Sequence, residues 1–337
     1  MQLNSRQFVL SKRPVGLPNE STFTLEKVSL PTDLKDNELL LHGLFYSVDP
    51  YMRGRMNEGK SYVEPFALNK PIEGSVVARV KESKSKNIKK DDLVVGQLPW
   101  ATDLVCNADS VHKISPSVDD VSKYLGILGM TGLTAYFGLT KIGKPKAGDT
   151  VVISGAAGAV GVVVGQIAKI FGCKVIGIVG SDKKIEVLKN QFGFDEAINY
   201  KDAETLDKKI KLACPKEIDI YFDNVGGPIS DTVLRHMNFQ SRVVICGQIS
   251  LYNAKDFTPG PRIQPLILTK SILMQGFIVG NFKHEFAEGT EAISKWIKDG
   301  KLRSLETVVN GFDHLPEAFL GLFSGKNNGK MIVKADA

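Results

Sequence analysis

Residues 155–161 read Gly-Ala-Ala-Gly-Ala-Val-Gly, and this run decides the fold. An apolar β-like stretch, Thr150–Ser154, precedes it, and a helix-like stretch, Val162–Phe171, follows it. At a strand-to-helix turn, only small residues let backbone amides come close to a pyrophosphate, and the helix points its unpaired N–H groups at that charge. A second β-like run, Lys174–Val179, completes a βαβ unit. This context predicts a nucleotide-binding turn, not one that only packs helix on strand, although the spacing departs from a strict GxGxxG.

Strand-like and helix-like patterns keep alternating after this unit. Such alternation is typical of a parallel sheet covered by helices on both faces. The expected strands are Glu196–Asn199, Ile218–Asp223 and Ser241–Cys246, with a further apolar run at Ser271–Val279. The expected helices are Lys123–Leu128 and Thr134–Leu139, broken at Gly129–Gly132, then Lys183–Phe192, Ala203–Ala213, Ser230–Met237 and Glu285–Asp299.

The two ends of the chain have a different texture, in which short β-like runs are separated by Pro, Gly, Asp and Asn. The clearest runs are Phe23–Val28, Glu38–Val48, Ser75–Val80, Leu93–Gln97, Glu306–Val309 and Lys330–Lys334. We therefore predict an α/β protein in which a doubly wound Rossmann domain, residues 127–302, is inserted into a β-rich domain. That second domain is formed by residues 1–126 and completed by residues 303–337.

Composition narrows the class of protein. With 337 residues, 43% hydrophobic residues, 24% charged residues and a net charge of +6, the chain is typical of a globular protein with sizeable cores. The four cysteines form no CxxC pair, and no long apolar segment occurs, so we expect a cytoplasmic protein that does not enter a membrane. The lysine cluster at Lys81–Lys90 contains no aromatic residue, which favours a solvated loop over a nucleic-acid surface.

The end of the second Rossmann strand indicates which cofactor is bound. A site for NAD usually places Asp or Glu there to bind the ribose 2′-hydroxyl. Here the strand ends in Val179-Gly180-Ser181, and Lys183 and Lys184 follow Asp182. A missing carboxylate with two nearby cations favours the 2′-phosphate of NADP, although the lysines could also be an ordinary solvated helix face. Asp182, at a helix start, is a candidate N-terminal cap.

Two further loops follow strands, which is where open α/β sheets bind ligands. The first is Asp223-Asn224-Val225-Gly226-Gly227, and the second runs from Cys246 to Asn253. Small residues there allow a nucleotide to approach the backbone, while Asn224, Ser250 and Tyr252 offer polar groups.

A zinc site is not expected. Catalytic zinc needs Cys or His ligands, and before Cys173 the chain has one cysteine, Cys106, and two histidines, His42 and His112. Since His42 lies in an apolar run, we expect a histidine whose partners are structural. The predicted set of metal-binding residues is therefore empty.

Several motifs together resemble one family. They are VDPYMR (Val48–Arg53), GMTGLTAYFGL (Gly129–Leu139), GAAGAVG, GSDKK, FDNVGG (Phe222–Gly227) and CGQISLYN (Cys246–Asn253). In this order, across nearly the whole chain, they resemble the zinc-independent medium-chain dehydrogenase/reductases, in the branch of prostaglandin, alkenal double-bond and curcumin reductases. The resemblance implies a GroES-like domain around the Rossmann domain, NADP(H) as cofactor, and reduction of the carbon–carbon double bond of α,β-unsaturated ketones or aldehydes.

The resemblance also assigns cofactor contacts and a homodimer formed through edge strands near Ser271–Val279. Together with the residue patterns above, it gives this predicted cofactor set: Met130, Thr131, Gly155, Ala157, Gly158, Ala159, Val160, Gly161, Gly180, Ser181, Lys184, Tyr200, Asn224, Cys246, Gly247, Gln248, Ile249, Ser250, Tyr252, Phe277, Ile278, Val279 and Asn327.

Without a metal, another group must stabilise the charge that develops on the oxygen of an enone. A phenol can do so as oxyanion-hole donors do, and the candidates are Tyr252 and Tyr51, with a ribose hydroxyl of the cofactor as the third. Arg53 and Arg55 are candidates for attracting an anionic group or for structural pairing. Two other functions stay open: a quinone reductase of the same superfamily, and an NADP-binding protein without catalysis.

Overall fold

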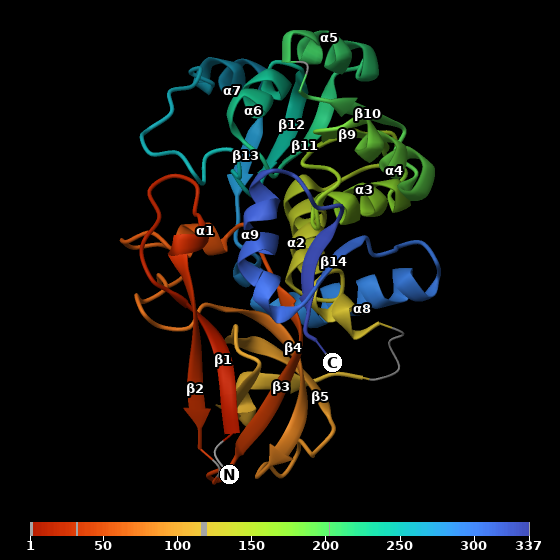
Figure 1. Cartoon of the computed structure of the whole chain (residues 1–337). Helices are drawn as coiled ribbons and strands as arrows, with labels where there is room; N and C mark the ends of the chain where they lie inside the picture. Colours follow the sequence, from red (N-terminus) through yellow and green to blue (C-terminus); the bar gives the residue numbers. More distant parts are fainter. Residues whose placement is uncertain (1–2, 32, 116–119, 202, 337) are drawn as a thin grey trace. The chain divides into compact units, whose positions relative to one another are not determined.

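The computed structural model describes residues 3–31, 33–115, 120–201 and 203–336. These residues form two compact units, traced in Figure 1. The first unit comprises Met1–Leu125, Thr307–Asn327 and Met331–Ala337, and the second comprises Gly126–Glu306 and Asn328–Lys330. The β-rich ends of the chain thus fold together, and the alternating region folds as a separate body.

The second unit is built on a parallel sheet in the strand order β10-β9-β8-β11-β12-β13. Its strands are β8 (Thr150–Ser154), β9 (Lys174–Val179), β10 (Glu196–Asn199), β11 (Ile218–Asp223), β12 (Met237–Ile245) and β13 (Leu273–Gly276). In order of appearance this is 3-2-1-4-5-6, the arrangement of dinucleotide-binding sheets, whose order reverses between β8 and β11. The predicted doubly wound α/β fold is confirmed.

Helices cover both faces of this sheet (Figure 1). They are α2 (Met130–Phe137), α3 (Gly161–Ile170), α4 (Asp182–Phe192), α5 (Ala203–Ala213), α6 (Gly227–Leu234), α7 (Gln264–Lys270) and α8 (Phe286–Lys298). Along β8, Val151 and Ile153 belong to the apolar cluster with α2, α3 and α8, whereas Val152 belongs to the cluster with α5, α6 and α7. Since successive side chains of a strand point to opposite faces, both faces of the sheet are buried, as its apolar strands require.

Several predicted boundaries of helices and strands in the second unit are wrong. The helix expected over Ser230–Met237 is α6, which begins at Gly227 and ends at Leu234, so that β12 already begins at Met237. Gly226 and Gly227 have φ of 70° and 59°, and this glycine turn starts the helix earlier than the apolar pattern suggests. The apolar run Ser271–Val279 contains only the short strand β13, and α7 before it was missed.

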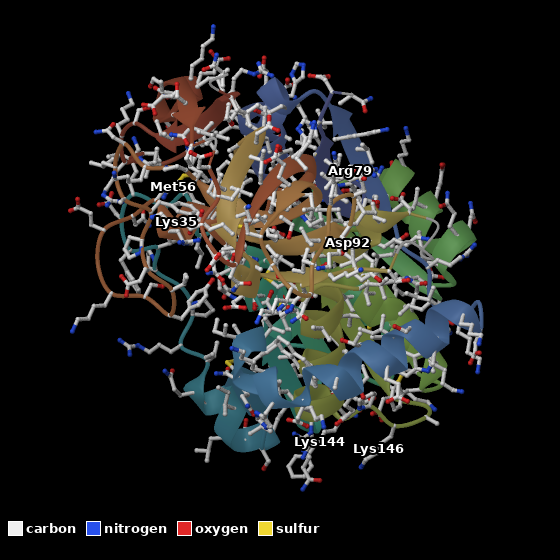
Figure 2. All side chains as sticks on the ribbon, turned by 90° about the horizontal axis from the view of Figure 1, so that it is seen from below. Lys35, Met56, Arg79, Asp92, Lys144 and Lys146 are labelled. Carbon is white, nitrogen blue, oxygen red and sulfur yellow. The ribbon has the colours of Figure 1, made fainter. Side chains whose placement is uncertain are left out.

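The predicted break between two helices exists, but it lies at residues 126–129, between the 3-10 helix Val121–Leu125 and α2, so that Met130 to Gly132 already belong to α2. A Cβ on Gly132 would lie 1.8 Å from the Ile127 carbonyl oxygen, so this glycine permits a close approach and does not interrupt the helix. A π-helix, Gly138–Gly143, continues α2 and ends at Lys144, whose φ is 52°; Figure 2 labels Lys144.

The first unit contains a seven-stranded sheet in the order β14-β15-β3-β4-β5-β7, with β6 paired to β3, and a hairpin of β1 and β2. The strands are β1 (Leu3–Leu10), β2 (Phe23–Leu30), β3 (Glu38–Ser47), β4 (Glu73–Ser83), β5 (Leu93–Pro99), β6 (Asp103–Asn107), β7 (Val111–Lys113), β14 (Glu306–Asn310) and β15 (Lys330–Lys334). All six predicted runs in these ends of the chain are strands. The structure also contains elements that the residue pattern did not predict, namely β1, β6, β7, and the helices α1 (Met52–Arg55) and α9 (Leu315–Phe323).

The lysine cluster Lys81–Lys90 begins in the last three residues of β4 and continues into the connection to β5, and its lysine side chains are exposed. Asp92, labelled in Figure 2, pairs with Lys113 at 2.8 Å, and burial is too slight to offset the hydrogen bond that keeps the pKa of Asp92 low. The prediction of a solvated loop is confirmed.

Within the described ranges, no helix combines the length and apolar character needed to cross a bilayer.

Candidate cofactor site

The glycine-rich turn joins β8 to α3 in the second unit. Gly155 has a φ of 59°, a left-handed conformation that lets the chain leave β8 sharply. A Cβ on Gly161 would lie 2.5 Å from the Gly155 carbonyl oxygen and 2.7 Å from the Cα of Ala156, so a larger residue would push α3 off the strand. The Gly158 N–H donates to the Gly155 carbonyl at 2.9 Å and closes the turn. Gly155 is therefore required by its backbone conformation and Gly161 by the lack of space for a side chain.

The same turn presents backbone donors. Within α3, the Val162 and Val164 amides already donate to the Gly158 and Val160 carbonyls at 3.1 and 2.9 Å. The donors that the turn offers to a ligand are therefore the amides that lead into the helix, those of Ala159, Val160 and Gly161. On its other side, the Ala157 carbonyl accepts from the Gly329 N–H at 2.7 Å, which fixes the turn to residues 328–330 of the same unit. A rigid turn whose remaining donors point along a helix axis fits a pyrophosphate.

Cations gather where β9 and β10 end. Ser181 occupies the N-cap position of α4 without making a side-chain capping bond, and Tyr200, 37% exposed, lies against Gly180. Burial and the neighbouring charge of Lys201 lower the pKa of Lys184. Like charges placed together at a partly desolvated position are stabilised by an anion, as a phosphate would supply.

Asp182 has a role other than the predicted cap. It is the first residue of α4, whereas Ser181 is the N-cap, and its carboxylate accepts a hydrogen bond from the Asn199 Nδ2 at 3.0 Å. Asp182 therefore ties α4 to β10.

The loops after β11 and β12 are bound to each other. The Asn224 side chain donates to the Ser154 carbonyl at 2.8 Å, which places it at the end of β8, beside the glycine-rich turn. The Cys246 and Gly247 amides donate to the Asp223 carbonyl at 2.9 and 3.1 Å, and the Ile249 amide donates to the Asn224 carbonyl at 3.4 Å. The Ser250 Oγ donates to the Val225 carbonyl at 2.7 Å. Both predicted loops thus form one structure at the carboxyl edge of the sheet.

Tyr252 lies near the end of the second loop and brings a phenol group to this edge of the sheet. The Gln248 backbone N–H donates to the Tyr252 hydroxyl oxygen at 3.2 Å. Burial raises the pKa of Tyr252, with smaller contributions from Cys246 and Asp223, whereas the bond from Gln248 lowers it. The group is therefore protonated at neutral pH. Because its oxygen already accepts a bond from Gln248, its proton can be donated to an external acceptor.

The start of α2 carries an unsatisfied polar atom. Among the described residues, Thr131 Oγ1 is buried without a hydrogen-bond partner, and Thr131 follows Met130 in the first turn of this eight-residue helix. A buried hydroxyl without a partner is costly unless a ligand satisfies it. This fits the predicted role of Met130 and Thr131 beside a polar part of a cofactor.

The residues after β13 contribute differently from one another. The Phe277 ring is buried in the core, where a Cβ on Gly138 would lie 2.6 Å from its Cζ. The Ile278 amide donates to the Asn281 side chain at 2.9 Å, and Ile278 is 38% exposed. Val279 begins the 3-10 helix Val279–Glu285. The Phe277 side chain is therefore taken up by core packing, whereas Ile278 is exposed and Val279 is half-buried.

The remaining predicted site residues, Tyr51 and Asn327, belong to the first unit. Tyr51 is the N-cap of α1, and burial together with nearby Asp49 raises its pKa, while a hydrogen bond with Arg55 opposes that shift. Tyr51 is therefore also a protonated donor at neutral pH.

The two arginines of this segment have structural partners. Arg53 is 2% exposed and donates to the carbonyls of Pro14 and Gly16 at 3.2 and 2.8 Å. Arg55 stacks on the Phe66 ring, with 4.0 Å from its Cζ to the ring centroid, and donates to the Glu64 carbonyl. Of the two roles considered for Arg53, structural pairing is the one found.

Metal-ligating side chains do not gather in the described ranges, where no group of three or more His, Cys, Asp or Glu residues could hold an ion. His42 pairs with Asp103, with 2.9 Å between Nδ1 and Oδ1.

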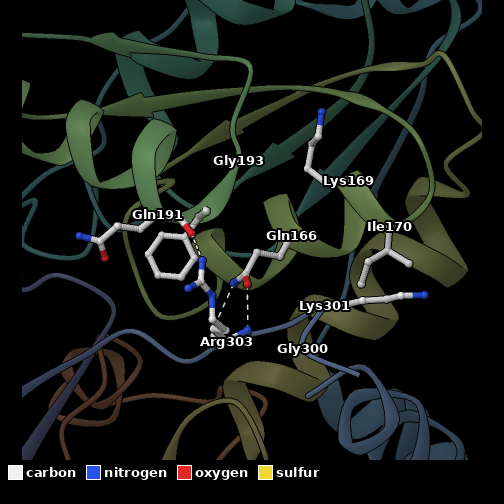
Figure 3. A pocket seen from close by; sticks show the side chains of 9 residues that line it. Gln166, Lys169, Ile170, Gln191, Gly193, Gly300, Lys301 and Arg303 are labelled. Atoms are coloured by element: carbon white, nitrogen blue, oxygen red, sulfur yellow. Dashed lines mark hydrogen bonds between the residues drawn. The ribbon is translucent and has the colours of Figure 1, made fainter. Parts of the chain in front are cut away.

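A cavity of about 540 Å³ lies at the carboxyl ends of α3 and α4 (Figure 3). The Arg303 guanidinium donates to the Gln191 carbonyl, and the Arg303 amide donates to the Gln166 side chain at 2.9 Å. Cations that bond the last carbonyls of a helix stabilise its end. Since the glycine-rich turn is at the opposite end of α3, this cavity is separate from the predicted nucleotide site.

Two residues of this edge, Lys201 and Ser154, were not among the predicted site residues. Lys201 follows Tyr200 at the end of β10, and its effect on Lys184 depends on the pairing of β10 with β9. Ser154 ends β8, and its hydroxyl accepts from the Asn224 amide and donates to Asp223. The rule that polar residues at strand ends bind ligands could have found both.

Comparison with known proteins agrees with this architecture. Residues 6–114 match the family described as the N-terminal domain of oxidoreductase, and residues 159–295 match the family described as zinc-binding dehydrogenase. A Bacillus subtilis protein named as an NADP-dependent oxidoreductase, YfmJ, is 51% identical over 99% of this chain and 98% of its own length. A Nicotiana tabacum 2-alkenal reductase (NADP⁺-dependent) is 41% identical over 98% of each chain. The crystal structure of CurA from Vibrio vulnificus in complex with NADPH has a TM-score of 0.93 and 39% identity, and covers 98% of this chain and 99% of that one.

Proposed function

This chain belongs to the medium-chain dehydrogenase/reductase superfamily, in the branch of NADP-dependent prostaglandin, alkenal and curcumin reductases, and from that premise we propose that it reduces the carbon–carbon double bond of enones and enals with NADPH. The observation that carries the proposal is Tyr252, a protonated phenol whose oxygen accepts the Gln248 amide at the carboxyl edge of the Rossmann sheet.

The preference for NADPH is supported by charge at the end of β9. No carboxylate stands at Gly180 or Ser181, so a ribose 2′-hydroxyl would lack its usual acceptor. Lys184 and Lys201 lie close enough for the second to lower the pKa of the first. A 2′-phosphate there would relieve the repulsion between them and accept hydrogen bonds from the lysines and the Ser181 hydroxyl.

The other cofactor contacts follow from the same geometry. The glycine-rich turn would hold the pyrophosphate on the first amides of α3, and Thr131 Oγ1 would receive the partner that it lacks within the described part of the chain. Asn224 and the backbone of Cys246–Ser250 would line the ring and ribose that continue from the pyrophosphate.

Bound NADPH supplies the hydride, which we assign to the β-carbon of the unsaturated carbonyl compound. Negative charge then develops on the carbonyl oxygen of the substrate, and the resulting enolate takes a proton at its α-carbon, from tyrosine or water, to give the saturated product. Tyr252 would donate its proton in a hydrogen bond to that oxygen, where a positioned donor lowers the barrier most. Because burial raises the pKa of Tyr252, the phenol keeps its proton at neutral pH and is available as a donor. The roles of Tyr51 and of a cofactor hydroxyl stay alternatives for the same oxygen.

The proposal is tested by following NADPH oxidation with matched enones, enals and quinones. With NADPH that carries deuterium at the transferred position, NMR of the product should show deuterium on the β-carbon and a saturated bond. Rapid turnover of quinones without consumption of any enone would replace the proposal with a quinone reductase. Tight NADPH binding without oxidation by any compound would indicate a protein without catalysis.

Three further expectations belong to this proposal. Residues 127–302 would act as the NADP-binding domain, and residues 1–126 with 303–337 as the GroES-like catalytic domain. A homodimer would form through edge strands, and β13, in the predicted segment, is the last strand at one edge of the parallel sheet. A cytoplasmic location is expected from the cysteine usage. Sedimentation of the purified protein tests the dimer.

A further inference from the structure

Gln248 has the longest side chain in the loop between β12 and Tyr252, and that side chain is turned inward. Its Nε2 donates to the Gly247 carbonyl at 2.9 Å and to the Asp223 Oδ2 at 3.2 Å. A flexible amide therefore has two fixed acceptors, one of them a carboxylate. Bonds to an ionised group are about twice as strong as bonds between neutral groups, so the Asp223 contact determines where Gln248 lies.

Asp223 is a fixed point because donors from several elements surround it. Its side chain is fully buried, and Oδ1 accepts hydrogen bonds from Ser154 Oγ at 2.8 Å and the Tyr221 hydroxyl at 2.9 Å. The Val225 and Gly226 amides donate to the same oxygen at 3.0 and 2.9 Å. A buried carboxylate oxygen needs hydrogen-bond donors to replace the water that it loses, and together these donors prevent Asp223 from moving.

Gly226 leaves room for the Gln248 amide. A Cβ on Gly226 would lie 2.1 Å from the Gln248 Oε1, and the φ of Gly226 is 70°. No other residue fits this position without moving Gln248. The Gln248 amide thus occupies space that a glycine at position 226 leaves open.

The backbone of Gln248 is in turn the partner of Tyr252. Its N–H donates to the phenol oxygen at 3.2 Å, and a Cβ on the preceding residue, Gly247, would lie 3.2 Å from the same oxygen. The position of the phenol thus depends on where this peptide group lies. One residue links the buried carboxylate, through its side chain, to the tyrosine, through its backbone.

We propose that Gln248 is the positioning residue of Tyr252, and that its side-chain bond to Asp223 holds the amide that directs the phenol proton toward the substrate oxygen. The inference rests on the proposed function. Gln248 touches no reacting atom; it acts by fixing the orientation of a donor, and the rate of reduction depends steeply on that orientation.

The test compares Gln248→Met with Ser230→Ala in the full-length protein. Methionine keeps the length of the side chain and loses the N–H donor. Ser230, on α6, donates to the same Oδ2 of Asp223 at 2.9 Å, so its removal costs Asp223 a comparable bond away from the loop. We expect kcat for an enone to fall about tenfold in Gln248→Met, with KM for NADPH within about twofold, and to stay within about twofold in Ser230→Ala.

Two further readouts separate positioning from general damage. In Tyr252→Phe, adding Gln248→Met should lower kcat no further, because the group that Gln248 positions is already gone. In the cofactor-free protein, hydrogen exchange of the Ile249 and Ser250 amides should quicken in Gln248→Met and not in Ser230→Ala.

Unchanged kcat and exchange in Gln248→Met would overturn the inference, as would equal losses in both single variants or additive losses in the double variant. If Gln248→Met does not fold, Gln248→Ala replaces it with the same expectations. Failure of the wild-type protein to reduce any enone would instead overturn the proposed function, while faster exchange in Gln248→Met would still support the anchoring of the loop.

Discussion

Two stretches of the carboxyl edge of the Rossmann sheet differ in their charged groups and in how those groups are paired. After β9 and β10, Lys184 lies near a second cation, Lys201, at a partly buried position. At the end of β11, one buried carboxylate, Asp223, accepts hydrogen bonds from hydroxyls, amides and the Gln248 side chain. Repulsion between like charges is relieved by an anionic ligand, whereas a satisfied carboxylate gains nothing from one. The first stretch is therefore suited to recognition of the cofactor, and the second to holding a donor in place.

The largest effect is expected from breaking the satisfied carboxylate. Asp223→Asn would turn an amide N–H toward groups that are themselves donors, and we expect the free energy of unfolding to fall by about 3 kcal/mol. Urea unfolding followed by circular dichroism measures this. Asp231→Asn, which changes another carboxylate of the same region on α6, is the control and should change stability by less than about 1 kcal/mol. Equal losses in both variants would show that Asp223 is no special anchor.

Removing the phenol hydroxyl tests what that anchor serves. We expect Tyr252→Phe to lower kcat for an enone on the order of 100-fold, because the developing charge on the substrate oxygen loses a donor. Stability should change little, and Tyr124→Phe, at a tyrosine packed in the first unit, serves as the control. Steady-state kinetics measure both. An unchanged rate would transfer the role to Tyr51 or to a ribose hydroxyl.

At the cationic stretch, Lys184→Ala should raise KM for NADPH about tenfold and leave KM for NADH nearly unchanged, since only NADPH carries the 2′-phosphate. Lys183→Ala provides a matched control, because Lys183 is the adjacent lysine on α4 and is exposed. A rise of equal size for both cofactors would remove the assignment of the 2′-phosphate to Lys184.

A smaller effect is expected from pH. Burial and Lys201 lower the pKa of Lys184 in the free protein, so this lysine loses its charge at a lower pH than an ordinary lysine. Binding of the 2′-phosphate favours the charged form, and KM for NADPH should therefore rise as pH increases into the alkaline range. In Lys184→Arg the guanidinium stays charged, and the rise should disappear. A rise that persists in this variant would assign the titration to another group.

Much of the fold follows from local sequence. The glycine-rich turn is determined by spacing within a short segment, because a side chain at Gly161 would collide with the backbone of Gly155 and Ala156 in the same turn. The strands of the parallel sheet can also be predicted from the sequence, since burial on both faces requires continuous apolar runs. The predicted boundaries failed at α6 and β12, where the turn at Gly226 and Gly227 sets the helix start and the apolar pattern does not.

The candidate site could be predicted from the sequence where one residue type implies one kind of ligand. The absent carboxylate after Val179 and the lysine at 184 indicated a phosphate without any knowledge of tertiary contacts. Lys201 could not be found in this way, because its distance from Lys184 depends on β10 pairing with β9. The hydrogen bond of the Gln248 side chain could not be predicted either, since its acceptor, Asp223, is twenty-five positions earlier in the chain.

The sequence by itself therefore determined the nucleotide-binding turn, the sheet class and the sign of the charge at the end of β9, because each depends on sterics or composition within a short segment. Tertiary structure alone decided which strand ends meet, and with them the pair of Lys184 with Lys201 and the connection from Asp223 through Gln248 to Tyr252. Strand order brings these residues together, and strand order is a property of the whole sheet.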